Sequence, residues 1–243
     1  MNNGRVLACS DLHGRYDIYE NICKMLMPED KVYFLGDAND RGPDGWKLIK
    51  AIINNPRFIY IKGNHEQMLV DAGRAMLKNN FHSKSVRLLM QNGGYGTLCD
   101  WQQEEEKFQD DWLNYIDKLP TYQVYQNVDG LIIFLSHAGC TPYIIGDELM
   151  VSPNLLWDRT HFREAWAKGC ENIIVVHGHT PNCFIDEEVN AKLDAEVELG
   201  AYWYNENHKV CLDTGAYWTD TAVLLDLDDF TEYIIQGEVE NEE

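Results

Sequence analysis

Five short segments of the chain carry residues that can bind metal ions or phosphate. They read SDLHG at 10–14, GDANDRG at 36–42, GNHE at 63–66, SHAG at 136–139 and HGHTP at 177–181. Carboxylate oxygens, imidazole nitrogens and an amide oxygen suit first-row divalent metal ions, and these segments contain no thiolate ligand. With an arginine among them, the five segments together predict a site in which two metal ions cleave phosphate esters.

The first three segments each follow an apolar run that is typical of a buried strand. Strands are expected at 5–10, 31–35 and 58–61, with helices between them at 18–27 and 46–53. This β-α-β-α-β order favours a parallel sheet. Because ligands bind beyond the carboxyl ends of such strands, we expect Asp11, Asp37 and Asn64 to converge at one edge of the sheet.

The rest of the chain reads as a long helical segment followed by further strands. Residues 66–118 predict helices interrupted by loops at 79–80 and 92–94, and 122–127 with 131–135 predict a β-hairpin. Further strands are expected at 173–176, 209–212, 222–227 and 232–235. Because no linker separates the motifs, we expect a single α/β domain over residues 1–243, with a helical insert at about 66–118.

The composition of the chain restricts its partners and its compartment. A formal net charge of −20 repels nucleic acid and anionic membranes, so neither is expected as a partner. The apolar runs are much shorter than the ~20 residues that cross a membrane, and the N-terminus does not resemble a secretory signal. The seven cysteines include no CxxC pair, so we expect reduced thiols in a cytoplasmic protein.

The ordered set of motifs resembles the calcineurin-like metallophosphoesterase superfamily over roughly residues 5–215. The forms GDxxDRG and GNHE narrow the resemblance to the phosphoprotein phosphatase branch. That branch includes bacterial and phage serine/threonine protein phosphatases and symmetrical diadenosine tetraphosphate hydrolases. The resemblance implies the superfamily's four-layer sandwich, in which two packed mixed β-sheets are flanked by helices.

The resemblance also implies a set of metal ligands and a cofactor. Two divalent metal ions would be bound, with manganese expected and iron or zinc as alternatives. A water held between the two ions would attack the phosphorus, so no covalent phosphoenzyme is needed. Asp11 and His13 would bind the first ion, and the carboxylate of Asp37 would bridge both ions. Asn64, His137 and His179 would complete the second.

Four further residues are expected to act on the substrate. By resemblance His65 is the general acid that protonates the leaving oxygen, and Asp40 would pair with it and keep it protonated. Arg41 would contact the phosphate, because a guanidinium fork fits two phosphoryl oxygens. Arg159 in the segment LLWDR is the candidate for a second phosphate-binding arginine. The alternative for Arg159 is a surface ion pair with the neighbouring Asp158.

The HGHTP segment contains a second histidine and departs from the wider superfamily. By resemblance His179 is the ligand, and His177 is expected at the end of a strand. The wider superfamily often has another histidine where this chain has Pro181, a departure that the phosphoprotein phosphatase branch shares. Asp213 in LDTGA also resembles a recurring segment, and we expect it to support the site without binding metal.

The leading substrate class is phosphorylated protein, mainly phosphoserine or phosphothreonine. The alternative is symmetrical hydrolysis of bis(5'-nucleosyl) tetraphosphates by the same chemistry, and a non-catalytic phosphate-binding regulatory module is a remote third.

Residues 72–99 contain no acidic residue, and they could form a cationic rim for an anionic substrate or only a solvated helix face. Residues 186–198 carry six acidic residues and one lysine, and they could form an exposed loop or a lid. The four cations of the basic stretch are Arg74, Lys78, Lys84 and Arg87.

Overall fold

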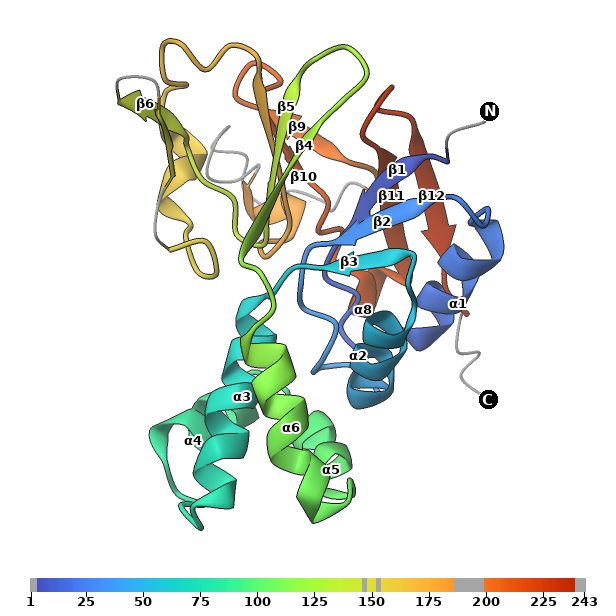
Figure 1. The fold of residues 1–243 in the computed structure, drawn as a ribbon, viewed down its shortest axis with the longest axis vertical. Coiled ribbons are helices and arrows are strands. Elements are labelled where there is room, and N and C mark those ends of the chain that lie inside the picture. Colours follow the sequence, from blue (N-terminus) through green and yellow to red (C-terminus); the bar gives the residue numbers. More distant parts are fainter. Residues whose placement is uncertain (1–3, 146–147, 152–153, 186–198, 239–243) are drawn as a thin grey trace.

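The computed structural model describes residues 4–145, 148–151, 154–185 and 199–238. Within them the chain forms two five-stranded mixed sheets and one two-stranded sheet. The sheets lie together at one end, and the helices between residues 64 and 117 extend away from them (Figure 1). This arrangement is the α/β fold with two mixed sheets and flanking helices that the sequence predicts. Every helix in the described part of the chain is too short or too polar to span a bilayer.

The first sheet contains the predicted β-α-β-α-β unit. Its strands follow the order β12-β11-β1-β2-β3, with β1, β2 and β3 parallel and β11 antiparallel to β1. Helices α1 (Tyr16–Met25) and α2 (Gly45–Asn54) make the two crossovers. The strands are β1 (Val6–Cys9), β2 (Lys31–Phe34), β3 (Phe58–Tyr60), β11 (Thr221–Asp226) and β12 (Glu232–Gln236).

The second sheet contains the predicted hairpin and places two parallel strands beside it. Its order is β4-β5-β8-β10-β9, with β5, β8 and β10 parallel to one another. The sequence did not predict β9 or the separate pair β6 and β7, which are strands of only three residues each. The strands are β4 (Tyr122–Gln126), β5 (Ile132–Ser136), β6 (Tyr143–Ile145), β7 (Glu148–Met150), β8 (Ile173–His177), β9 (Tyr202–Tyr204) and β10 (Lys209–Cys211).

Burial on both faces explains why the strands read as continuous apolar runs. In β1, Ala8 belongs to a core cluster shared by the two sheets, whereas Leu7 and Cys9 pack into the cluster beneath the helices. Alternate side chains of a strand point to opposite faces, so both faces of the first sheet are covered. The shared cluster includes Leu35 from the first sheet and Val176 from the second. The polar loops that carry the motifs are thereby held at the edges of two sheets packed face to face.

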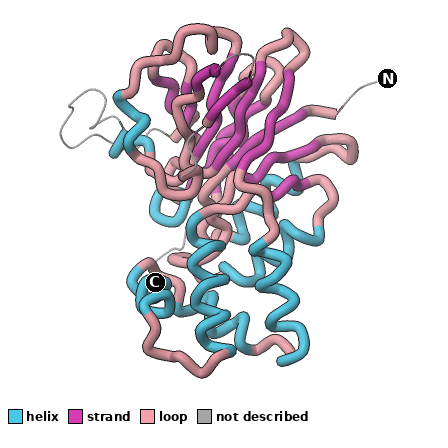
Figure 2. The backbone as a smooth tube through the Cα atoms, turned by 60° about the vertical axis from the view of Figure 1, so that its left-hand side comes forward, coloured by secondary structure: helices cyan, strands magenta, loops and turns pink. Residues whose placement is uncertain are grey.

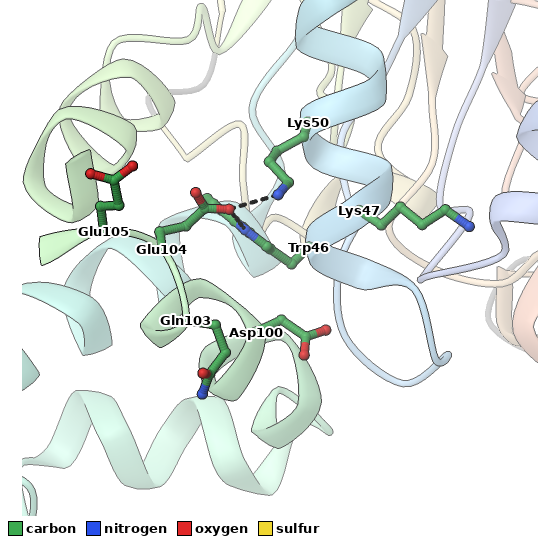
Figure 3. A pocket seen from close by; sticks show the side chains of 7 residues that line it. All are labelled: Trp46, Lys47, Lys50, Asp100, Gln103, Glu104 and Glu105. Carbon is green, nitrogen blue, oxygen red and sulfur yellow. Dashed lines mark hydrogen bonds and ion pairs between the residues drawn. The ribbon is translucent and has the colours of Figure 1, made fainter.

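Four helices occupy the segment that the sequence predicts to be helical. They are α3 (Asn64–Leu77), α4 (Lys84–Gln91), α5 (Tyr95–Gln102) and α6 (Glu106–Asp117). The tube view shows helices gathered at the end of the molecule away from the strands (Figure 2). Glu104, just after α5, ties this segment to α2, because one of its oxygens accepts from Trp46 Nε1 at 2.8 Å and from Lys50 Nζ at 2.6 Å (Figure 3).

A buried lysine lies in the second sheet behind the motif loops. Lys209 of β10 is fully buried, and its Nζ donates to the Thr141 hydroxyl at 2.7 Å and to the His161 carbonyl at 2.6 Å. Burial lowers the pKa of Lys209 to about 8, because the charged form loses its hydration. The protonated form of Lys209 therefore destabilises the folded protein relative to the neutral form.

We predict that Lys209→Met removes a pH-dependent part of the stability. The folded pKa of about 8 lies below the value of ~10.4 for an unfolded lysine, so between these values the unfolded state binds more protons. The free energy of unfolding of the wild-type protein should therefore rise over this interval relative to that of the variant. Urea unfolding at a series of pH values measures the difference. A constant difference between the two proteins across the interval would contradict the prediction.

Candidate metal and phosphate site

The five motif loops meet where the two sheets come together. Asp11 and Asp37 follow β1 and β2, and Asn64 follows β3 at the start of α3. His137 and His179 follow β5 and β8 of the other sheet. The convergence of Asp11, Asp37 and Asn64 is therefore as predicted. The second sheet adds its two histidines to the same edge, so all six predicted ligands lie at one place.

Two groups of buried side chains offer metal-ligand atoms, and Asp37 belongs to both. Ligand atoms of His13, Asp37 and His65 lie within 4.8 Å of one another, and so do those of Asp37, His137 and His179. Asp37 Oδ2 is 3.6 Å from His13 Nε2, and Asp37 Oδ1 is 3.3 Å from His137 Nε2. The two oxygens of one carboxylate therefore face two separate groups, as the predicted bridging role of Asp37 requires.

The remaining predicted ligands complete these two groups. Asn64 Oδ1 lies 2.8 Å from His137 Nε2 and 3.0 Å from His179 Nδ1. Asp11 Oδ1 lies 3.9 Å from His13 Nε2, while its other oxygen accepts a hydrogen bond from the backbone of His179 at 2.9 Å.

The hydrogen bonds on the far side of two rings determine which ring nitrogens face inward. His13 Nδ1 lies 2.8 Å from the Asn39 carbonyl, and His137 Nδ1 lies 2.8 Å from the Leu35 carbonyl. Because a carbonyl only accepts, each Nδ1 carries a proton. Burial lowers the pKa of His137 to about 3 and that of His13 well below its usual range, so both rings are neutral. Their Nε2 lone pairs therefore point at the carboxylate and amide oxygens.

These lone pairs fit a bound cation and are otherwise unfavourable. Asp11 Oδ1 and His179 Nε2 are buried, and neither finds a hydrogen-bond partner within the described residues. Burial raises the pKa of Asp11 and of Asp37 well above the usual range, and the charges of Asp213 on Asp11 and of Asp11 on Asp37 add to it. A divalent cation stabilises buried carboxylates and unpaired imidazole nitrogens alike, so the donor set fits a metal ion.

Strained backbone accompanies the site, and no sequence signal revealed it. Half of the twelve described non-glycine residues with positive φ lie in the motif loops, where a Cβ makes that conformation unfavourable. Such strain persists only where the surrounding structure determines it, and it clusters at functional sites. The six are Asp11 (52°), His13 (41°), Asp37 (58°), Asp40 (70°), Arg41 (66°) and His179 (70°).

The predicted acid, its partner and the phosphate-binding arginine contact one another. His65 Nδ1 lies 2.7 Å from Asp40 Oδ2, so the carboxylate accepts the ring proton. The Arg41 guanidinium reaches His65 Nε2 at 3.2 Å and His13 Nε2 at 2.8 Å. Its carbon lies 5.0 Å from the centre of the Tyr217 ring, a cation–π contact. Arg41 therefore lies among the ring nitrogens that face the two groups.

Two uncharged groups of the helical segment hold the backbone of Asp40 and Arg41, and nothing in the sequence pointed to them. The backbone N–H of Asp40 donates to the Thr97 hydroxyl at 3.0 Å, and that of Arg41 donates to the Gly93 carbonyl at 3.1 Å. A Cβ at Gly93 would lie 3.2 Å from the Arg41 nitrogen, and the φ of Gly93 is +84°. Thr97 therefore supports the site through its hydroxyl, and Gly93 supports it through its backbone.

Of the four basic residues that could form a cationic rim or only a solvated helix face, Arg74 is paired within the helical segment. Its guanidinium binds Asp117 at 3.0 Å and Asn114 at 3.1 Å, so it joins α3 to α6. Asp117 lies 43 residues further along the chain, so the spacing of residues in the sequence does not reveal this pair. Lys84 and Arg87 are exposed on α4, and their role in a rim stays a prediction. The acidic stretch 186–198 lies outside the described residues.

Arg159 lies in the same cleft as Arg41 and His179. Its neighbour Asp158 instead accepts bonds from the backbone and hydroxyl of Thr160 at 2.8 and 2.7 Å. The Trp157 ring lies 6.1 Å from the His179 ring. This placement is consistent with the predicted phosphate contact of Arg159.

His177 and Asp213 lie behind the site. His177 ends β8, and its Nε2 pairs with the Tyr204 hydroxyl at 2.8 Å, which agrees with the expected place at a strand end. Asp213 is buried, and its carboxylate accepts from the Gly215 backbone at 2.9 Å. Burial raises the pKa of Asp213 to about 6.

Glu66 is a further supporting residue to which the sequence analysis gave no role. Its carboxylate is fully buried, and one oxygen accepts from the backbones of Gly63 and Asp37 at 2.7 and 2.9 Å. The other oxygen accepts from the Ala38 backbone and the Tyr60 hydroxyl, both at 2.8 Å. The side chain of Glu66 therefore holds the loop that presents Asp37.

Comparison with known proteins gives one family and two kinds of relative. The family model described as calcineurin-like phosphoesterase matches residues 4–214. The asymmetrical bis(5'-nucleosyl)-tetraphosphatase PrpE of Anoxybacillus flavithermus is 26% identical over 182 residues, which are 68% of this chain and 69% of that protein. Serine/threonine-protein phosphatase 2 of Escherichia coli is 28% identical over 159 residues, which are 63% of this chain and 66% of that protein. The second alignment thus spans just under two thirds of its relative.

A solved structure shows the same fold. It is a serine/threonine phosphatase from Saccharomyces cerevisiae, with a TM-score of 0.57 and 14% sequence identity over 99% of this chain and 82% of that one. At this identity the likeness concerns the arrangement of strands and helices alone.

We predict that Glu66→Gln weakens metal binding. The amide nitrogen of glutamine would face two of the four donors that Glu66 accepts, and each lost buried bond costs about 1–3 kcal/mol of stability. The displaced Asp37 loop should lower the affinity for manganese by about 10- to 100-fold, as for other residues that orient metal ligands. Calorimetric titration of the metal-free protein measures the affinity. The control is Gln67→Glu, which makes the reverse substitution at the neighbouring position. An unchanged affinity in Glu66→Gln would contradict the positioning role.

Proposed function

The chain belongs to the calcineurin-like phosphoesterase family, and from that premise we propose that it hydrolyses phosphate esters at the site around Asp37. One observation carries the proposal. The two oxygens of the Asp37 carboxylate face two groups of buried metal-ligand atoms, at 3.6 Å from His13 Nε2 and 3.3 Å from His137 Nε2. A carboxylate shared in this way is what a pair of metal ions needs.

Six residues are proposed as metal ligands, with manganese as the metal and iron or zinc as alternatives. Two such ions, when bound, supply an activated water and neutralise the charge on the phosphoryl oxygens. The inward-facing nitrogens of His13 and His137 and the unpartnered oxygen of Asp11 support this assignment. The six are Asp11, His13, Asp37, Asn64, His137 and His179.

The two arginines would bind and orient the phosphoryl group. In this structure Arg41 donates to His13 Nε2 and His65 Nε2. A metal ion would otherwise bind the first of these nitrogens, and the substrate would contact the second. When phosphate binds, the guanidinium can turn its fork of donors to two phosphoryl oxygens. Arg159 lines the same cleft and would contact the phosphate from a second direction.

His65 would supply the proton that the leaving oxygen needs. Its Nδ1–H is held by Asp40 at 2.7 Å, so in the protonated ring Nε2 carries the proton that can be transferred. As the oxygen of water bonds to phosphorus, the bond to the leaving oxygen breaks and His65 Nε2 protonates it. The proton that the water loses passes to solvent.

The relatives support two substrate classes. One is named a serine/threonine phosphatase, which matches the leading prediction of a phosphoserine or phosphothreonine protein. The other is named an asymmetrical tetraphosphatase, whereas the sequence analysis expected the symmetrical reaction as the alternative. A non-catalytic module stays the remote alternative, and the presence of His65, Asp40 and Arg41 in mutual contact speaks against it.

We predict that His65→Asn lowers kcat for p-nitrophenyl phosphate by about 10²–10⁴-fold, because it removes the general acid. The manganese content per chain should stay that of the wild type, measured by elemental analysis after desalting. His82→Asn, which changes an exposed histidine between α3 and α4, is the matched control and should retain its turnover.

Two results would contradict the role of His65. An unchanged kcat would show that another group protonates the leaving oxygen. A loss of bound metal would make His65 a ligand, which its place near His13 and Asp37 allows geometrically.

A further inference from the structure

A buried histidine, His161, lies behind the loop that carries the proposed metal ligand His137. It belongs to the one-turn 3₁₀-helix η1 (Thr160–Arg163), which begins directly after Arg159. The side chain of His161 is fully buried, and His161 is not among the described residues that line the cleft with Arg41 and Arg159. Any effect of His161 on the site must therefore pass through the residues that it contacts.

Hydrogen bonds hold the backbone of the loop that carries His137. The His137 carbonyl accepts from the backbone N–H of Gly178 at 2.8 Å, and the Ala138 N–H donates to the Leu155 carbonyl at 2.8 Å. A further bond comes from a side chain, because His161 Nε2 lies 2.8 Å from the Ala138 carbonyl. His161 therefore acts on the peptide unit that directly follows the ligand.

The next residue of this loop, Gly139, packs against the His161 ring. Its φ is +76°, and a Cβ at this position would lie 2.9 Å from His161 Cε1 and 2.9 Å from His177 Cγ. Such contacts are too close for a Cβ, so the two rings approach the backbone as only a glycine allows. The rings themselves meet edge to face, with their centroids 5.3 Å apart. The loop is thus bonded to His161 at Ala138 and packed against its ring at Gly139.

The proton of the His161 ring lies on the nitrogen that faces the loop. A carbonyl only accepts, so Nε2 donates to Ala138. Burial lowers the pKa of His161 to about 3, so the ring is neutral and its Nδ1 carries a lone pair. Nδ1 lies 3.5 Å from Lys209 Nζ, which is a donor.

Lys209 holds His161 from the side away from the loop. Its Nζ donates to the His161 carbonyl at 2.6 Å and to the Thr141 hydroxyl at 2.7 Å. Together with His161 Nδ1, these groups give the three donors of the ammonium three acceptors. All three acceptors are neutral, so they offset the lost hydration of the charge only in part, which agrees with the lowered pKa of Lys209. Lys209 therefore contacts both the backbone and the ring of His161.

We propose that His161 is a positioning residue for the metal ligand His137, and that Lys209 holds His161 in the orientation that this role requires. The contacts run from β10 through η1 to the loop after β5. Without the bond to Ala138, the backbone that keeps His137 Nε2 at 3.3 Å from Asp37 Oδ1 would lose its side-chain support. The inference rests on the metal site of the proposed function, but it does not depend on hydrolysis.

The test compares two amide side chains that differ by one methylene group. In His161→Gln the amide nitrogen extends about as far as histidine Nε2 and can donate to Ala138, whereas in His161→Asn it is too short to do so. Metal-free protein is titrated with manganese by calorimetry. His161→Asn should raise the Kd of one of the two ions about tenfold and leave the other within about twofold. His161→Gln should keep both Kd values within about threefold of the wild type.

Electron paramagnetic resonance of the bound manganese identifies the weakened ion. Two manganese ions that share the Asp37 carboxylate give a spin-coupled signal, whereas a single ion gives an uncoupled one. His161→Asn should therefore show the uncoupled signal at manganese concentrations at which the wild type is already coupled. The matched control is His208→Asn. His208 Nδ1 lies 3.2 Å from the Ile173 carbonyl of the same sheet, away from the ligand loops, and its loss should leave both Kd values unchanged.

Lys209→Met is a second variant, which keeps an apolar side chain of similar length but has no donor. It should raise the same Kd by a smaller factor, because His161 keeps its own bond to Ala138. Should His161→Asn fail to fold, an unchanged Kd in Lys209→Met would overturn the inference.

Three further results would overturn the positioning role of His161. They are an unchanged Kd for both ions in His161→Asn, an equal loss at both ions, and a loss in His161→Gln as large as that in His161→Asn. The second result would show a general loss of structure, and the third would show that the bond to Ala138 is not what matters.

The same measurements distinguish this inference from the proposed function. A wild-type protein that binds two manganese ions with this dependence on His161, but hydrolyses no p-nitrophenyl phosphate, would refute catalysis and leave the positioning role standing. A wild-type protein that hydrolyses the ester and binds two ions, with His161→Asn unaffected, would refute the positioning role alone. A wild-type protein that binds fewer than two ions would contradict both.

Discussion

The structure depends on one electrostatic constraint, which is the burial of Asp11 and Asp37 beside imidazole nitrogens that carry no proton. Their lone pairs converge, and burial raises the pKa of both carboxylates well above the usual range. Without cations such an arrangement is unfavourable, and with cations it becomes a strong binding site. The sheets, the strained loops and the helical segment all act to hold these groups in that arrangement.

The support around the site is distributed over several layers. Glu66 accepts four hydrogen bonds and holds the Asp37 loop, while Thr97 and Gly93 hold the backbone of Asp40 and Arg41. Six motif residues have positive φ, a conformation that such anchoring can maintain. The residues packed against the motif loops thus determine the geometry of these loops, and the site can therefore be precise although it is built on loops.

Three of the six proposed ligands could be brought together from local signals in the sequence, whereas the assignment of all six as ligands came from the resemblance. Asp11, Asp37 and Asn64 follow apolar runs, and parallel strands bring such positions to one edge. The roles of Thr97 and Glu66 depend on tertiary contacts, which residue type and spacing do not reveal. The ion pair of Arg74 could not be foreseen for the same reason, since its partner Asp117 approaches only when α3 packs on α6. The strands β6, β7 and β9 were not predicted either.

Anomalous diffraction from crystals grown with manganese would show directly whether Asp37 bridges two metal ions. We predict two metal peaks per chain, one on each side of the Asp37 carboxylate. His13 should lie at one peak, and His137 and His179 should lie at the other. A single peak, or two peaks that do not share Asp37, would contradict the central claim that one buried carboxylate holds two metal ions.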